Sequence, residues 1–294
     1  MIEELLGFAR ELGRDAGRLL LEQQGRAVVS VKWDGSVVTE ADLAVDRLVQ
    51  QRIQASYPGH GILSEESHTV YGGAADGERF TWVIDPLDGT TNYSLGLCYW
   101  GCSIAVVSDG MPVVGVLVMP MLGAEFWAIK GGGAFLNGER LGGGGGGVSK
   151  RSSFVAICSR SWRYLELPVR QKGRLLGSAA YDLAAVAQGI AVGCSQVLSH
   201  IWDLAASWLL IREAGRSIGS LLPDAPDPFP MVPGSDYESR VFPLAAGSDE
   251  EFLRLIQSKV RIKPAAQGRF DALAEAGWDM RAARQAARQE RRQG

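Results

Sequence analysis

Two aspartates, Asp85 and Asp88, stand three residues apart at the end of a hydrophobic run and lead into Gly89, Thr90 and Thr91. Two carboxylates this close repel each other unless a positive charge lies between them. Their hard oxygen atoms are the ligands that Mg²⁺ prefers. The backbone N–H groups and hydroxyls of the Gly-Thr-Thr turn are suited to bind a phosphate. The motif therefore indicates metal-assisted phosphoryl chemistry at this turn.

Three other segments place a carboxylate at the end of an expected helix or strand, at Asp42, Glu65 and Asp203. Each also has a purely structural interpretation. Asp42 can complete a capping box with Thr39, Glu65 can belong to a solvated turn, and Asp203 can be an N-cap. Because the three carboxylates occur together with the double-aspartate turn, the purely structural interpretations are less favoured for the set than for each residue alone.

The elements that must position these side chains can be expected from hydrophobic periodicity. Apolar residues at helical spacing predict a helix over 2–20 and a second helix after Thr39. Alternating or continuous apolar runs predict strands at 61–64, 82–84, 102–107, 112–119 and 125–130, which would form an antiparallel sheet. Beyond six consecutive glycines at 142–147 the pattern changes to strand 154–158, helix 181–192, strand 195–199 and helix 203–214.

Composition narrows the class of protein. The 294 residues are 46% hydrophobic and 21% charged, which is typical of a globular protein, and the formal net charge of −3 argues against a general nucleic-acid binder. The four cysteines do not have the spacing of a zinc site and are expected to be free thiols in a reducing compartment. The longest apolar run is too short to span a bilayer and the first residues lack the basic region of a signal peptide. We therefore expect a cytoplasmic protein without a membrane partner.

The change of pattern predicts three regions. Residues 1–147 would form an N-terminal α+β half that binds metal and phosphate, and residues 148–262 a C-terminal α/β half that binds substrate. Residues 263–294 end in a basic stretch with few large apolar side chains, which predicts a flexible tail.

Five segments of the chain resemble the inositol monophosphatase family, a superfamily of Mg²⁺-dependent, Li⁺-sensitive phosphatases. The resemblance runs from about residue 1 to 260, and Asp-Pro-Leu-Asp-Gly-Thr-Thr with a downstream Trp-Asp is its most specific part. The matching segments are 34–42, 62–66, 85–93, 133–138 and 201–206 with 213–215. The resemblance implies a layered αβαβα sandwich with the site between the two halves, and a homodimer.

The resemblance also implies roles for individual residues. Glu65, Asp85 and the backbone carbonyl of Leu87 would hold one Mg²⁺, while Asp85, Asp88 and Asp203 would hold a second, and Glu65 would share in a third. Asp42 and Thr90 would position and activate the attacking water, with Glu65 as a further catalytic residue. The backbone N–H groups of Gly89 and Thr90 would bind phosphate. Substrate contacts would come from Asp88, Asp203, Gln196 and the stretch Gly177, Ser178 and Ala179.

The implied activity is hydrolysis of a small polyol phosphate, foremost inositol 1-phosphate, by a metal-activated water. Family members that act on inositol phosphate carry an acidic residue where this chain has Gln196, so the ring identity stays open. Fructose-1,6-bisphosphatase, 3′(2′),5′-bisphosphate nucleotidase and histidinol-phosphate phosphatase are alternatives. Thr91 and Asn92 stand where nucleotidases commonly have Lys-Glu. A catalytically silent metal-binding or regulatory relative is the alternative outside enzymes.

Overall fold

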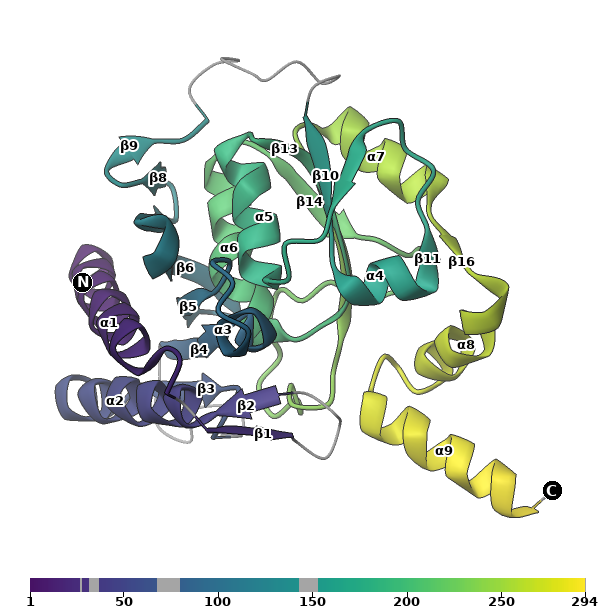
Figure 1. Ribbon diagram of the computed structural model, residues 1–294, viewed down its shortest axis with the longest axis horizontal. Helices are drawn as coiled ribbons and strands as arrows, with labels where there is room; N and C mark the ends of the chain where they lie inside the picture. Colours follow the sequence, from purple (N-terminus) through teal and green to yellow (C-terminus); the bar gives the residue numbers. More distant parts are fainter. Residues whose placement is uncertain (27, 32–36, 68–79, 143–152, 294) are drawn as a thin grey trace.

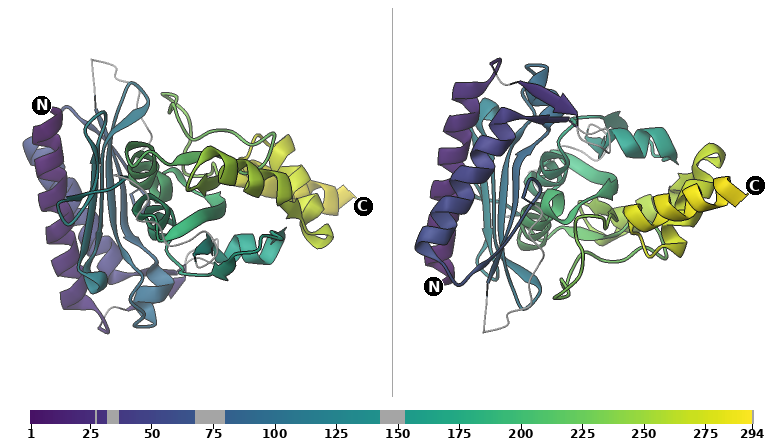
Figure 2. Two further views of the ribbon diagram at one scale, coloured as in Figure 1. Left: turned by 90° about the horizontal axis from the view of Figure 1, so that it is seen from above. Right: turned by 90° about the horizontal axis from the view of Figure 1, so that it is seen from below.

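The computed structural model describes residues 1–26, 28–31, 37–67, 80–142 and 153–293, and at 31 and 290–293 it describes the backbone alone. The expected turn at 33–36, most of the glycine run and the expected boundary at 147 lie outside the described residues. Five layers follow one another: a helix pair, a large sheet, a second helix pair, a smaller sheet and an outer helical layer (Figures 1 and 2). The expected αβαβα arrangement is confirmed.

The first helix pair, α1 and α2, packs on one face of the large sheet. Leu5, Leu12 and Leu20 of α1 lie on one helical face and are almost fully buried in a core shared with Trp82 and Ile104 of the sheet. The helical periodicity in the sequence is therefore the periodicity of burial. The bounds are α1 (Ile2–Gln23) and α2 (Glu40–Ser56), joined through the small sheet β1 (Val29–Val31) and β2 (Val37–Thr39).

The large sheet has its seven strands in sequence order, β3 to β9. All its neighbours pair antiparallel, as expected, except β3 and β4, which pair parallel. A parallel pair needs a connection of about a dozen or more residues, and 16 residues separate β3 from β4. The strands are β3 (Gly61–Ser64), β4 (Thr81–Asp88), β5 (Gly101–Ser108), β6 (Met111–Met119), β7 (Ala124–Ile129), β8 (Gly133–Leu136) and β9 (Glu139–Arg140), with the 3-10 turn η1 (Pro120–Leu122) before β7.

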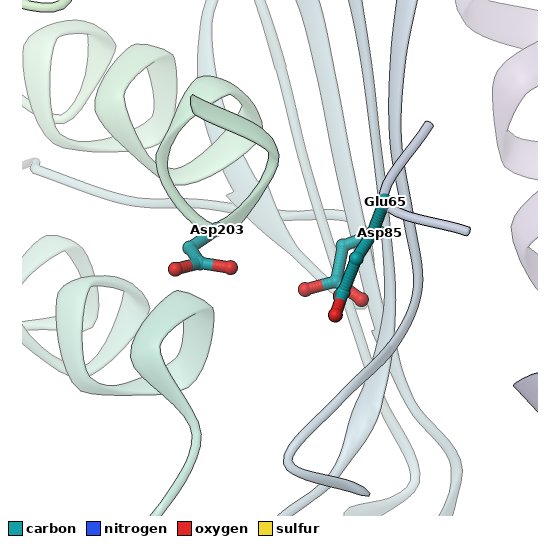
Figure 3. Close-up of side chains that lie close together, drawn as sticks. All are labelled: Glu65, Asp85 and Asp203. Carbon is teal, nitrogen blue, oxygen red and sulfur yellow. The ribbon is translucent and has the colours of Figure 1, made fainter. Parts of the chain in front are cut away.

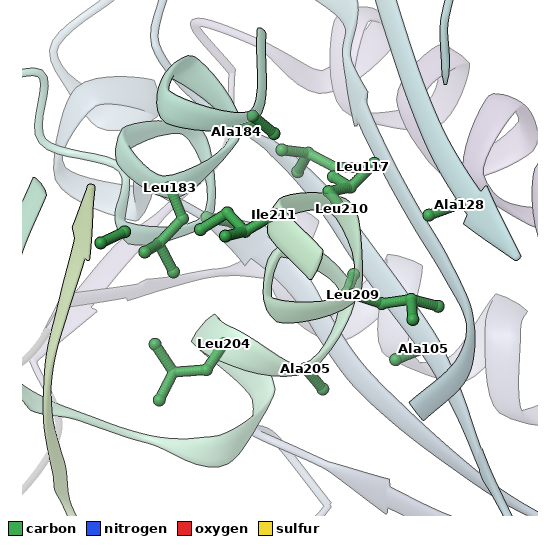
Figure 4. Close-up of a cluster of buried hydrophobic side chains, with 14 of the residues drawn as sticks. Ala105, Leu117, Ala128, Leu183, Ala184, Leu204, Ala205, Leu209, Leu210 and Ile211 are labelled. Atoms are coloured by element: carbon green, nitrogen blue, oxygen red, sulfur yellow. The ribbon is translucent and has the colours of Figure 1, made fainter. Parts of the chain in front are cut away.

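The central helices α5 (Ala179–Gln188) and α6 (Ile201–Glu213) lie between the two sheets. In Figure 4, Leu183 of α5 and Leu209 and Leu210 of α6 belong to the same apolar cluster as Leu117 of β6. Helix α6 is buried on nearly every side, as expected for a helix whose apolar residues are not confined to one face. This packing holds the first turn of α6 against the end of the large sheet.

The smaller sheet has the order β12-β10-β13-β15-β14 and mixes parallel and antiparallel pairs. Its strands are β10 (Phe154–Ile157), β12 (Lys172–Arg174), β13 (Ala191–Ser199), β14 (Ser217–Ser220) and β15 (Phe242–Gly247). Helix α7 (Glu250–Lys259) covers its outer face. Short elements complete the fold: α3 (Thr90–Ser94), α4 (Ser159–Tyr164) and the pair β11 (Leu165–Glu166) and β16 (Arg261–Ile262).

Two expectations for the C-terminal half are wrong. The helix expected at 181–192 ends at Gln188, because Gly189 adopts a left-handed conformation and caps it, and Ala191 already begins β13. The segment expected to be a flexible tail forms η2 (Pro264–Ala266), α8 (Gln267–Glu275) and α9 (Met280–Gln293). Phe270, Leu273 and Trp278 are buried in the outer core and dock α8 and the turn after it, whereas residues 285–289 of α9 are exposed.

None of the helices in the described part of the chain combines the length and the apolar character needed to cross a membrane.

Candidate active site

Three carboxylates from different elements meet in one group. Glu65, Asp85 and Asp203 each place an oxygen within 4.8 Å of the others (Figure 3). The parallel pairing aligns Ser64 with Ile84, so that the next residue on each strand is an acid at the same edge. Asp203 faces them from the first turn of α6. The expectation that distant acidic segments converge is therefore confirmed for these three residues.

The environment of this group disfavours negative charge. Asp85 is 1% exposed. Burial and the charges of Glu65 and Asp88 raise its pKa well above the ordinary value. Burial, together with Asp88 and Glu65, also raises the pKa of Asp203 to about 8, although the backbone N–H of His200 and the charge of Arg160 oppose the rise. Several acids that resist ionisation in one place are a typical feature of a cation site.

Asp88 is oriented differently from the other acids. Its carboxylate accepts hydrogen bonds from the hydroxyl of Ser178 and from the backbone N–H groups of Ala179 (3.1 Å) and Ala180 (3.0 Å) at the start of α5. It is not part of the group formed by Glu65, Asp85 and Asp203. Burial raises the pKa of Asp88 to about 6 against these hydrogen bonds. Its role as a metal ligand stays a prediction, as do the substrate contacts of Ser178 and Ala179.

Asp42 and Thr90 form the expected pair. The Thr90 hydroxyl lies 3.1 Å from Oδ1 of Asp42 and 2.9 Å from the backbone carbonyl oxygen of Leu87. One hydroxyl hydrogen can serve only one of these acceptors at a time. Burial raises the pKa of Asp42 to about 6, although Thr39 and Thr90 donate hydrogen bonds to it. Asp42 also closes a capping box with Thr39, so its structural and functional interpretations hold together.

A capping box likewise fixes Asp203. Its Oδ2 accepts the backbone N–H of His200 at 2.9 Å at the start of α6. This hydrogen bond occupies one carboxylate oxygen at the helix terminus. The expectation that Asp203 is itself the N-cap is wrong, because His200 is the N-cap of α6 and Asp203 is its third residue. From that position Asp203 accepts the N–H of the N-cap and also belongs to the acidic group.

The turn between β4 and α3 requires glycine at position 89. Gly89 has φ +86°, and a Cβ there would lie 2.7 Å from the backbone oxygen of Tyr99. The backbone of Gly89 and Thr90 therefore stays uncovered by a side chain at position 89. Both residues line a cavity of about 340 Å³ that also contains the acidic group.

This cavity lies at the junction of the two halves and falls within the size range of small-molecule sites. The N-terminal half contributes the acidic group with the β4–α3 turn, and the C-terminal half contributes the starts of α4, α5 and α6 with the end of β13. The described lining residues are Val37, Glu65, Asp85, Leu87, Asp88, Gly89, Thr90, Thr91, Cys158, Ser159, Arg160, Gly177, Ser178, Ala179, Asp182, Gln196, Val197, Ser199 and Asp203. Every residue expected at the site except Asp42 is among them, and Asp42 reaches the cavity through Thr90.

Gln196 lies at this cavity with a partner that the sequence reasoning missed. Its Nε2 donates to Oδ2 of Asp182 at 2.7 Å, and both side chains are fully buried. Oδ1 of Asp182 and Oε1 of Gln196 have no hydrogen-bond partner among the residues that the structure describes. Burial raises the pKa of Asp182 well above its usual value. The sequence signal that could have identified Asp182 is its position as a lone acid within the apolar run of α5.

The donor set fits Mg²⁺ better than it fits zinc. The group contains oxygen ligands alone, from three carboxylates, with the Leu87 carbonyl nearby. All four cysteines are free thiols, and none belongs to the group. A divalent cation would supply positive charge at the centre of this group, in which Asp85 is buried and Glu65 and Asp203 are half-buried.

Comparison with known proteins agrees with this geometry. The model of the inositol monophosphatase family matches residues 1–223. The inositol-1-monophosphatase of Mesorhizobium japonicum is 34% identical over 235 residues, covering 75% of this chain and 84% of that protein. The Nus factor SuhB of Escherichia coli K12 is 36% identical over 228 residues, covering 72% and 83%.

Solved structures show the same fold. The IMPase of Thermotoga maritima superimposes with a TM-score of 0.69 at 26% identity, covering 87% of this chain and 97% of that one. The SuhB protein of Bartonella henselae gives a TM-score of 0.71 at 26% identity, covering 87% and 98%. With the acidic group, the turn after β4 and the layered fold in agreement, the chain belongs to the inositol monophosphatase family of phosphatases.

Proposed function

We propose that the protein is a Mg²⁺-dependent phosphomonoesterase that hydrolyses a small polyol phosphate, with inositol 1-phosphate as the first substrate to test. One observation carries the proposal: Glu65, Asp85 and Asp203 converge in a cavity that also exposes the β4–α3 turn. The acids, which need a cation, and the turn, which is suited to bind an anion, therefore face the same small cavity. The names of the relatives support this reaction class.

Two to three Mg²⁺ ions would be held by Glu65, Asp85, Asp203 and the Leu87 carbonyl, and by Asp88 after its carboxylate turns away from α5. When bound, they would neutralise the phosphate and lower the energy of the charge that develops on its oxygens. The backbone N–H groups of Gly89 and Thr90 would orient the phosphate from the N-terminal half.

Thr90 and Asp42 would activate the attacking water. The Thr90 oxygen accepts a hydrogen bond from this water while its own hydroxyl hydrogen faces Oδ1 of Asp42. As the water oxygen bonds to phosphorus, its proton passes to Thr90 and the Thr90 proton passes to Asp42. The phosphorus–oxygen bond to the polyol breaks, and the alkoxide takes a proton from solvent water. An acid whose pKa is about 6 is well suited to accept this proton near neutral pH.

The polyol would lie toward the C-terminal half. Gly177, Ser178 and Ala179 border the cavity beside Asp88, and the Asp182–Gln196 pair lies behind them. Replacing Gln196 with Glu would put a second buried acid against Asp182 and is expected to change the KM for inositol 1-phosphate more than that for p-nitrophenyl phosphate. Equal changes for both esters would place Gln196 away from the ring.

Release of inorganic phosphate from a substrate panel tests the proposal. The panel holds inositol 1-phosphate, fructose 1,6-bisphosphate, 3′-phosphoadenosine 5′-phosphate and histidinol phosphate at fixed Mg²⁺. We expect turnover that EDTA abolishes, Li⁺ inhibits and Thr90→Ala lowers by about 10²- to 10⁴-fold in kcat. No turnover of any ester with Mg²⁺ would favour the silent relative. Size-exclusion chromatography and cell fractionation test the expected homodimer and cytoplasmic location.

A further inference from the structure

One cationic side chain lies among the acids of the active-site cavity. Arg160, the second residue of α4, is the only Lys, Arg or His among the described residues that line this cavity. It comes from the C-terminal half, whereas the phosphate-binding turn at Gly89 and Thr90 comes from the N-terminal half. Two features that favour anions therefore face the same volume from different halves of the molecule.

The backbone of β13 fixes the guanidinium of Arg160. Its Nη1 donates to the carbonyl oxygen of Leu198 at 2.7 Å. Leu198 has φ +60°, and the pairing of β13 with β15 is interrupted between Gln196 and Ser199. The interruption takes Leu198 out of the regular ladder, where Arg160 binds its carbonyl. The side chain is thus held at one end although much of it is exposed.

The remaining donors of Arg160 are not used by acids. A guanidinium has five N–H donors in a planar fork that suits phosphate and carboxylate groups, and the contact with Leu198 uses one. Among the described residues, Arg160 forms no ion pair within 4.0 Å, although five acids line the same cavity. Once cations neutralise those acids, the charge of Arg160 is available to a ligand.

Resting on the proposed phosphatase activity, we propose that Arg160 binds a second anionic group of the substrate, so that the site favours phosphate monoesters that carry a further phosphate or carboxylate. The hydrolysed phosphate lies at Gly89 and Thr90, and the second group reaches Arg160 across the cavity. Arg160 is then a specificity-determining residue of this site.

Three esters of one sugar test the proposal. Glucose 1-phosphate carries no second anion, glucuronic acid 1-phosphate carries a carboxylate, and glucose 1,6-bisphosphate carries a second phosphate. The kcat/KM of each is measured with Mg²⁺ for the wild type and for Arg160→Gln, and ³¹P NMR identifies the ester that is cleaved. Arg160→Lys keeps the charge without the planar fork. Arg163→Gln is the matched control, since Arg163 is exposed on the same helix and does not line the cavity.

A charged hydrogen bond to the substrate is worth about tenfold to hundredfold in kcat/KM. We expect Arg160→Gln to lower kcat/KM by that factor, chiefly through KM, for one or both doubly anionic esters. For glucose 1-phosphate the change should be less than about threefold. Whichever doubly anionic ester responds identifies the second group as carboxylate, phosphate or both. Arg160→Lys should lower the same kcat/KM values by a smaller factor, and Arg163→Gln should leave kcat/KM unchanged for all three esters.

Other outcomes would overturn the proposal. If Arg160→Gln affects all three esters equally, or none, while Mg²⁺-dependent hydrolysis persists, Arg160 only clamps Leu198 and the phosphatase assignment stands. If the wild type hydrolyses none of these esters or those of the first panel, the proposed function fails, and the role of Arg160 fails with it.

Discussion

Replacing Asp85 with Asn should stabilise the protein without Mg²⁺ and remove its response to Mg²⁺. Asn keeps the oxygen that accepts the Leu87 N–H at 3.0 Å, so the change is mainly one of charge. Oxygens of Asp85, Glu65 and Asp203 lie within 4.8 Å of one another, and each ionised pair at this separation repels by about 3 kcal/mol at an effective dielectric constant of about 20. Asp85 takes part in two such pairs, so neutralising it relieves up to about 6 kcal/mol at alkaline pH.

These energies translate into shifts of the unfolding temperature. An unfolding entropy of about 2.1 cal/mol/K per residue gives about 0.6 kcal/mol/K for 294 residues. The relief of up to about 6 kcal/mol then raises the Tm by up to about 10 °C in EDTA at pH 8.5. In the wild type, Mg²⁺ at 100 times its Kd adds about 2.7 kcal/mol, or about 4 °C. In Asp85→Asn this Mg²⁺ shift should fall below about 1 °C.

Calorimetry of the wild type and of Asp85→Asn, each in EDTA and in Mg²⁺, measures the four Tm values. Asp109→Asn is the matched control, because the same change is made at an exposed turn, in a left-handed conformation that Asn tolerates. It should leave both the Tm and the Mg²⁺ shift unchanged. A variant at position 85 that is less stable in EDTA and still responds to Mg²⁺ would refute the reasoning.

Four further predictions concern the pH dependence of stability, the pH dependence of Mg²⁺ binding, the phosphate turn and the C-terminal helices. Acids with raised pKa values, such as Asp42 and Asp203, bind more protons in the folded state than in the unfolded state. The free energy of unfolding in EDTA should therefore fall as the pH rises from 4 to 8. Calorimetry that finds it constant or rising would contradict these pKa shifts. Over pH 6 to 8 Mg²⁺ must displace the proton of Asp203, so its apparent Kd by titration calorimetry should fall by up to about tenfold per pH unit. Gly89→Ala should lower the free energy of unfolding in urea by more than about 2 kcal/mol. Gly96 also has a positive φ, but a Cβ there would meet no atom within 4 Å, so Gly96→Ala should cost about 1 kcal/mol. Equal costs would show that the contact with the Tyr99 oxygen does not matter. Phe270→Ala should lower the free energy of unfolding by about 3 kcal/mol, because Phe270 is 2% exposed. Unchanged stability would indicate that this segment is a flexible tail after all.

Sequence reasoning reached the acidic group because each of its members lies beside a boundary that the sequence marks. Glu65 directly follows β3, Asp85 lies in β4 where the pairing with β5 becomes irregular, and Asp203 lies in the first turn of α6. The layered arrangement was expected from the resemblance to the family. Periodicity by itself predicted α1 and a helix over most of α6.

The features that were missed depend on contacts that no local pattern encodes. The orientation of Asp88 depends on the start of α5, about 90 residues further along the chain. The position of Arg160 depends on an interruption in β13 that turns one carbonyl outward. The C-terminal helices depend on a few side chains, such as Phe270 and Trp278, which a basic composition conceals.

A crystal structure of the protein soaked in Mn²⁺ would test the central claim most directly, because the anomalous signal locates the ion without assumptions about its ligands. We predict a peak within coordination distance of carboxylate oxygens from Glu65, Asp85 and Asp203, lost in Asp85→Asn. A fully folded protein with no Mn²⁺ peak in this cavity at saturating concentration, or with peaks only elsewhere, would contradict the claim that these acids form a divalent-cation site.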